Sequence, residues 1–252
     1  ENNGCTPLFI ASQNGHEKVV EYLESVGAEV NRANKKGVTP LHVASRNGHE
    51  KVTKILTTAS AKINPVTKDG WTPLHLASEK GHGKVVEYLA TAGAEINRVN
   101  KNGSTPLFMA SRNGHEPIVK HLATLGAEIN RANHDGWTPL HVACEKGHEK
   151  VVEYLVTIGA EVNRANKKGA TPLHVASRNG HDKVIDKLTT AGAEINSVRN
   201  DGWTPLHIAC EKGHEKVVEY LVSLGAEINR VQNKGCTPLF IASHNGQETI
   251  VK

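Results

Sequence analysis

The sequence lacks the features that mark membrane, secreted and nucleic-acid-binding proteins. No apolar run is long enough to span a membrane and no signal-peptide pattern is present, so membrane insertion is not expected. No dense basic run occurs either, because 30 Lys and Arg residues are interspersed with 26 Asp and Glu residues, for a net charge of +4. This distribution argues against a nucleic-acid or membrane-surface patch.

Enzyme motifs are absent as well. The chain has no Gly-rich phosphate loop after a strand, no Gly-x-Ser-x-Gly and no His-Glu-x-x-His. Most of its 15 histidines recur every 33 residues without paired cysteines, whereas a structural zinc site usually has closely spaced ligand pairs. We therefore expect a non-enzyme with no catalytic residues, no metal, no cofactor and no small-molecule substrate. Repeated hydrogen bonding explains these histidines better, and it would make stability sensitive to pH near 6.

What the sequence does contain is a repeat. Thr-Pro-Leu occurs eight times at a constant spacing of 33, starting at residues 6, 39, 72, 105, 138, 171, 204 and 237. Units this short cannot fold alone and must stack on one another. We expect one solenoid domain over residues 1–252, with repeats 1–33, 34–66, 67–99, 100–132, 133–165, 166–198, 199–231 and 232–252. Such a stack offers a long surface, which favours a binding scaffold.

Each repeat predicts two helices and a loop. In repeat 34–66, Thr39 suits a helix N-cap, Pro40 the first helical position and Gly48 a left-handed cap. A second helix follows, with an apolar stripe that in the first repeat comprises Val19, Val20, Leu23 and Val26. Segments such as 34–37, which end in Gly, then favour a tight hairpin turn.

These residues closely resemble the ankyrin repeat family. Thr-Pro-Leu-His stands at 39–42, 72–75, 138–141, 171–174 and 204–207, and Gly-His joins the two helices in seven repeats. A Gly-Ala-x-Val/Ile-Asn ending begins at Gly27 and recurs in five later repeats. The resemblance implies an all-α ankyrin solenoid of stacked helix-turn-helix units with short β-hairpin loops, about eight repeats with the first and last incomplete. It also implies that the final Asn of this ending could be a substrate for asparaginyl hydroxylation.

A second period of 66 residues lies within the first. Trp71, Trp137 and Trp203 share one repeat position in alternate repeats. The same repeats carry Glu-Lys before the inter-helix Gly, where the repeats between them carry Arg-Asn. Duplication of a two-repeat block explains this alternation better than selection for a periodic ligand. The tryptophans are either aromatic anchors for a partner or residues that pack over neighbouring loops.

The family resemblance places partner binding on the hairpin tips and the concave face of the first helices. The matching residues are Trp71, Trp137, Trp203, Lys36, Arg46, Asp69, Glu79, Lys80, Arg112, Asp135, Glu145, Lys146, Arg178, Asp201, Glu211 and Lys212. We therefore expect a monomeric scaffold that binds one or more protein partners. A structural spacer or spring within a longer natural or engineered array is the alternative. Nucleic-acid binding through Lys35, Lys36, Lys167 and Lys168 is a third possibility, which the accompanying acidic residues oppose.

The cysteines predict free thiols. Cys144 and Cys210 lie two repeats apart, roughly 20 Å if each repeat advances by one helix spacing, and a disulfide requires Cα atoms within about 7 Å. Cys5 and Cys236 lie near opposite ends of the stack. Four unpaired thiols are typical of a reducing, cytoplasmic location.

Overall fold

The computed structural model describes residues 4–252, which form 16 α-helices and no β-strand. The chain divides into two compact units, unit 1 (Glu1–Glu128) and unit 2 (Ile129–Lys252). Helices of unit 1 are α1 (Pro7–Asn14), α2 (Glu17–Ser25), α3 (Pro40–Arg46), α4 (Glu50–Thr58), α5 (Pro73–Lys80), α6 (Gly83–Thr91), α7 (Pro106–Arg112) and α8 (Glu116–Thr124). Those of unit 2 are α9 (Pro139–Lys146), α10 (Glu149–Thr157), α11 (Pro172–Asn179), α12 (Asp182–Thr190), α13 (Pro205–Lys212), α14 (Glu215–Ser223), α15 (Pro238–His244) and α16 (Glu248–Val251).

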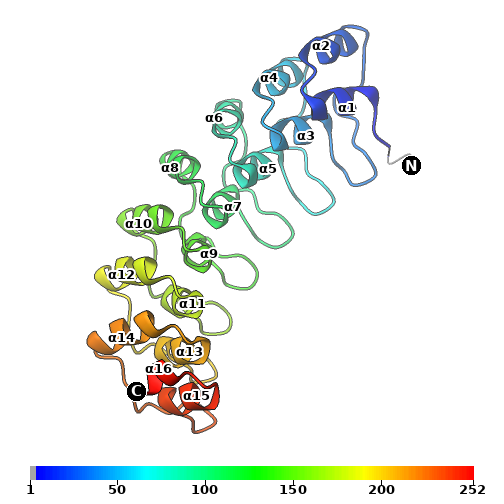
Figure 1. Cartoon of the computed structure of the whole chain (residues 1–252). Helices are drawn as coiled ribbons and strands as arrows, with labels where there is room; N and C mark the ends of the chain where they lie inside the picture. The colour runs from blue at the N-terminus through cyan, green and yellow to red at the C-terminus, as the bar shows by residue number, and fades with distance from the viewer. Residues whose placement is uncertain (1–3) are drawn as a thin grey trace. The chain divides into compact units, whose positions relative to one another are not determined.

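Within each unit the helices form two layers. In unit 1, the first helices α1, α3, α5 and α7 contact one another in succession, as do the second helices α2, α4, α6 and α8. Unit 2 repeats this arrangement from α9 to α16. Figure 1 shows the loops of unit 1 projecting on the side of the first helices, away from the second helices. The surface formed by the loop tips and first helices of a unit is called its loop face below.

Each first helix begins at the expected cap. The Thr39 side-chain oxygen accepts a hydrogen bond from the backbone N–H of His42 at 3.4 Å, and Pro40 occupies the first helical position. Gly48 follows the helix with a φ of 74°, the left-handed conformation that glycine adopts without strain. At the end of α4, Ser60 stands where other repeats have glycine and still adopts a φ of 67°.

The core lies between the two layers. Leu41 and Leu74 of the first helices are 1% exposed, and Leu56 and Leu89 of the second helices are fully buried. The apolar stripe predicted in the first repeat is only partly buried: Val20 is fully buried, but Val19 and Val26 are exposed. Val85, at the position of Val19, is buried, because α6 packs between α4 and α8, whereas among the second helices of residues 4–252 α2 packs on α4.

The loops are tight turns closed by hydrogen bonds rather than paired strands. In the first complete loop the backbone N–H of Asn34 donates to the Val38 carbonyl, and the N–H of Gly37 donates to the Asn34 carbonyl, both at 2.9 Å. Successive loops are also joined, as where the Lys68 N–H donates to the Lys36 carbonyl. Hairpin turns are therefore present as expected, but none of residues 4–252 is in a β-strand.

The asparagines at the repeat ends join neighbouring repeats. The Asn64 amide donates to the Gly93 carbonyl at 3.1 Å, and its Oδ1 accepts from the Glu95 N–H at 2.9 Å. Asn163 makes the same two bonds to Gly192 and Glu194 in unit 2. These side chains therefore have a structural role, and the bonds persist at the repeat that contains Pro65. Across residues 4–252, no helix is both long and apolar enough to cross a membrane.

Candidate functional site

The loop face is held in place by a network that uses the histidine of Thr-Pro-Leu-His. The Thr171 N–H donates to His174 Nδ1 at 3.2 Å, so this nitrogen acts as an acceptor. The other ring nitrogen, Nε2, lies 3.0 Å from the Trp203 carbonyl oxygen in the next loop and must donate to it. His42, His75, His141 and His207 make the equivalent bonds. Each histidine thus ties its own helix start to the following loop.

These contacts require neutral imidazoles. Burial lowers the pKa of His42, His75, His141 and His174 to about 4, and it also lowers the pKa of His207. A proton on Nδ1 would in addition face the N–H that now donates to it. The expectation of pH sensitivity near 6 is therefore refined. The folded histidines stay neutral well below pH 6, and the sensitive range extends down to about pH 4.

The histidines that follow the inter-helix glycines also bond between repeats. His82 Nε2 lies 2.9 Å from the Arg46 carbonyl oxygen, and His181 Nε2 lies 3.1 Å from that of Glu145. The hydrogen-bonding interpretation of the histidines is confirmed at these positions. Within residues 4–252, no group of three or more His, Cys, Asp or Glu side chains could hold a metal ion.

The three tryptophans are half-buried, and each packs against the histidine four residues later. The ring centroids are 5.9 Å apart for Trp71 and His75, and 5.7 Å apart for Trp137 and His141. Trp203 lies 5.9 Å from His207 in the same way. The tryptophans therefore cover the capping histidines of their own repeats, a contact other than the expected packing over a neighbouring loop, and part of each indole stays exposed on the loop face.

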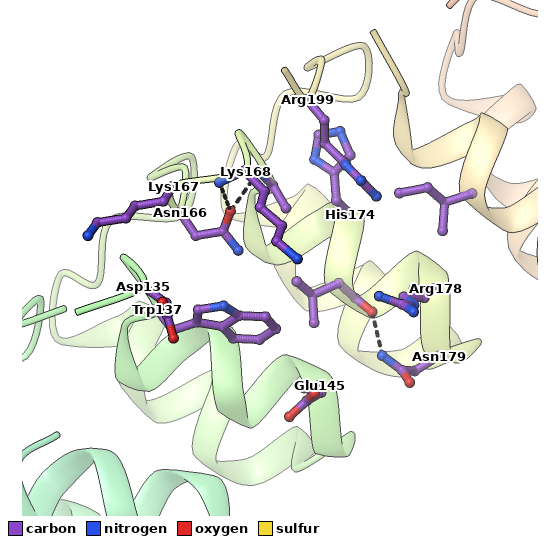
Figure 2. Close-up of a pocket in the computed structure, with 13 residues that line it drawn as sticks. Asp135, Trp137, Glu145, Asn166, Lys167, Lys168, His174, Arg178, Asn179 and Arg199 are labelled. Carbon is purple, nitrogen blue, oxygen red and sulfur yellow. Dashed lines mark hydrogen bonds between the residues drawn. The ribbon is translucent and has the colours of Figure 1, made fainter. Parts of the chain in front are cut away.

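In unit 2 the loop face forms a groove beside Trp137 with a volume of about 530 Å³. We call this the Trp137 groove; residues from three consecutive repeats line it (Figure 2). Its lining residues are Asp135, Trp137, Glu145, Asn166, Lys167, Lys168, Ala170, His174, Val175, Arg178, Asn179, Arg199 and Ile208. The groove is mostly polar, with Ala170, Val175 and Ile208 as aliphatic members and Trp137 as its large aromatic side chain.

Backbone contacts fix the loops around the Trp137 groove. Asn166 Oδ1 accepts the N–H groups of Lys168 and Ala170, at 2.9 and 3.0 Å. The Lys167 N–H donates to the Asp135 carbonyl at 3.1 Å, which joins this loop to the one before it. At the opposite side the Asn179 amide donates to the Val175 carbonyl at 2.8 Å. The polar side chains therefore project from loops and helix ends that are well anchored.

The Trp137 groove brings together four of the predicted contact residues, Asp135, Trp137, Glu145 and Arg178. The other predicted residues of unit 2 lie outside its lining set: Lys146, Asp201, Trp203, Glu211 and Lys212. Those of unit 1 occupy the same repeat positions, exposed or half-buried: Lys36, Arg46, Asp69, Trp71, Glu79, Lys80 and Arg112. Adjacent Glu-Lys pairs interact on both loop faces, at 3.4 Å for Glu79 and Lys80 and 3.7 Å for Glu145 and Lys146.

Several lining residues were not among the predicted contacts. Lys168, Ala170 and Asn179 occupy the same repeat positions as predicted contacts elsewhere, so the repeat alignment contains the signal for them. Lys167 was named, together with Lys168, only with the nucleic-acid alternative. Arg199 was missed for a different reason. It stands at the first loop position, which is Asn in four other repeats and has a structural function there. The departure of Arg199 from that pattern is the signal that identifies it.

The cysteines are free thiols, as expected. Cys144 and Cys210 are buried in first helices of unit 2, and burial raises both pKa values, that of Cys210 to about 11. Both side chains stay protonated at neutral pH and are poor nucleophiles. They therefore contribute to the core and not to a reactive site.

Comparison with protein families supports the same description. A family model described as ankyrin repeats (3 copies) matches residues 1–67, 61–133, 92–166, 118–199 and 173–252, which together cover the whole chain. Among curated proteins, no match to this chain was found. The helix pairs and the Thr-Pro caps recur in every repeat, and the family match covers all of the repeats. This chain belongs to the ankyrin repeat family.

Proposed function

We propose that this protein is one ankyrin repeat domain that acts as a protein-interaction scaffold and binds a segment of a partner protein on its loop face. Ankyrin repeats are generally protein-interaction modules. The observation that carries the proposal is the Trp137 groove, where an aromatic side chain lies among anchored polar groups. Partly exposed Trp and Arg in such a setting are typical of interface hot spots. We propose no catalytic, metal or cofactor chemistry for this face.

The described surface supports a protein partner more than a nucleic acid. Lys167 and Lys168 line the Trp137 groove together with Asp135 and Glu145, so the basic side chains do not form the continuous track that a phosphate backbone requires. The four free thiols support a reducing, cytoplasmic location. We propose that the protein acts as a monomer, with the loop face available to the partner.

The test is replacement of the three tryptophans together. The substitutions are Trp71→Ser, Trp137→Ala and Trp203→Ala. Other repeats carry these residues at the same position, as at Ser104 and Ala170. The variant should keep its helical circular dichroism while losing partner proteins in affinity capture from the native host. Undiminished capture by a folded triple variant would overturn the proposal.

A further inference from the structure

Arg199 breaks the pattern of the loops in unit 2. In the loop of Trp137, Asn133 Oδ1 accepts the N–H groups of Asp135 and Trp137, at 3.0 and 2.9 Å. Arginine has no acceptor and cannot do this. Instead Asp201 Oδ1 accepts the Trp203 N–H at 3.3 Å. The loop keeps its turn, and the side chain at 199 is released to line the Trp137 groove.

The Arg199 guanidinium is held in place with donors to spare. Its Nη2 pairs with Asp201 Oδ2 at 2.8 Å, and the side chain is 24% exposed. Its Nε is buried and has no hydrogen-bond partner among residues 4–252. A guanidinium has five N–H donors in a fixed fork. Arg199 is therefore preorganised, and its Nη groups, unlike the buried Nε, can still donate to an incoming oxygen.

Two further cations border the same space. Lys168 and Arg178 are exposed, and neither forms an ion pair with any residue from 4 to 252. In Figure 2, Lys168 extends toward the centre of the Trp137 groove, whereas Lys167 extends away from it. The carboxylates in the lining are Asp135 and Glu145, and Glu145 is paired with Lys146 at 3.7 Å. Asp201 offsets the charge of Arg199, and the charges of Lys168 and Arg178 remain. The side of the groove between Lys168 and Arg199 is therefore cationic.

We infer that the Trp137 groove binds an acidic segment of the partner polypeptide. The anionic group, a carboxylate or a phosphate, lies between Lys168, Arg178 and Arg199, and a neighbouring apolar side chain packs on Trp137. Arginine forks match the oxygens of both anions, and such charge-assisted bonds are stronger than neutral ones. This inference rests on the proposed function and adds the chemistry of the partner.

The experiment begins with selection from a random 12-residue peptide library displayed on phage, with the full chain immobilised. We expect the bound peptides to be enriched in Asp and Glu. One selected peptide is then synthesised with a fluorophore, and its Kd is measured by anisotropy against wild type and the double variant Lys168→Asn, Arg199→Asn. Loss of charge-assisted bonds should weaken binding at least about tenfold.

The substitutions have natural precedents in the chain. Asn occupies the position of Arg199 in four repeats and that of Lys168 at Asn102, so the double variant should fold. The matched control is Lys234→Asn, which removes an exposed lysine at the repeat position of Lys168, outside the lining of the Trp137 groove. The Kd of this control should stay within about twofold of wild type, a difference of roughly 0.4 kcal/mol, because the substituted lysine is outside the groove lining. Replacing one Glu of the peptide by Gln or by phosphoserine then distinguishes carboxylate from phosphate binding.

The outcomes separate the two proposals. Acid-enriched peptides that bind the double variant as tightly as wild type would overturn the inference. Peptides without acidic enrichment that lose binding in the triple tryptophan variant would overturn it too, and would leave the proposed function standing. Selected peptides that bind all variants equally, or a selection that yields no binder, would count against both.

Discussion

The regions around Trp71 in unit 1 and Trp137 in unit 2 share one scaffold and differ in charge. Both tryptophans follow a left-handed glycine and cover a capping histidine. Near Trp71 the charges of two acidic and two basic residues cancel, those of Asp69, Glu79, Lys101 and Arg112. The same positions around Trp137 also carry two acidic and two basic residues, Asp135, Glu145, Lys167 and Arg178. The Trp137 region has two further basic residues, Lys168 and Arg199. Unit 1 has Asn102 at the position of Lys168. A repeat can thus keep its packing constant while two substitutions redefine what one stretch of its surface attracts.

Acid tests how far the shared scaffold depends on its histidines. The folded pKa of His42, His75, His141 and His174 is about 4, below the unfolded value of 6.5. As pH falls through this window the unfolded chain binds protons that the folded chain does not, so stability is complete above about pH 6.5 and lost toward pH 4. At pH 4, each of these histidines should lower the free energy of unfolding by up to roughly 3 kcal/mol relative to pH 7. Urea unfolding followed by circular dichroism at pH 7, 5.5 and 4 measures the loss, and a constant midpoint would contradict it.

A single exchange sharpens the comparison of the two regions. His174 borders the Trp137 groove, and Phe108 occupies its position in unit 1. His174→Phe removes the bond to the Trp203 carbonyl and should cost about 1–3 kcal/mol at pH 7. At pH 4 the difference from wild type should shrink or reverse, because the variant has one histidine fewer to protonate. Urea midpoints at both pH values decide this, and a pH-independent difference would refute the assigned role.

The smallest expected effect is a gain in stability when a buried serine is replaced by alanine, and it should be equal in both units. Ser78 and Ser111 in unit 1 and Ser177 in unit 2 bury hydroxyl groups that have no partner among residues 4–252. Ser111→Ala and Ser177→Ala should each raise stability by about 1 kcal/mol, or the melting temperature by roughly 3 °C. Cys144→Ala, at the same repeat position, should instead lower it, since it removes a buried thiol that packs in the core. Thermal melts would contradict the account if the two serine variants moved in opposite directions.

Most of the scaffold was predictable from single residues. Thr-Pro at helix starts and glycine at helix ends determine backbone geometry locally, so their exact recurrence located every helix pair. The burial of the first repeat was less predictable. Val19 and Val85 occupy equivalent positions, yet only Val85 is buried, because burial depends on neighbouring helices and not on the pattern alone.

The Trp137 groove shows the same limit for the site. Asp135, Trp137, Glu145 and Arg178 were predicted because they occupy recurring contact positions. Arg199 stands at a position that is structural in other repeats, and its release depends on Asp201 accepting the Trp203 N–H. That compensation is a three-dimensional relation, and only the change from Asn to Arg hints at it in the sequence.

The central claim is that the Trp137 region, and not the Trp71 region, binds the partner's acidic segment. The most direct test is the Kd of one selected acidic peptide for Trp137→Ala and for Trp71→Ser, measured side by side on folded full-length protein. The account predicts at least about tenfold weaker binding for Trp137→Ala, the loss typical of a hot-spot residue, and a change within about twofold for Trp71→Ser. Equal weakening by both variants, or a larger loss for Trp71→Ser, would contradict it.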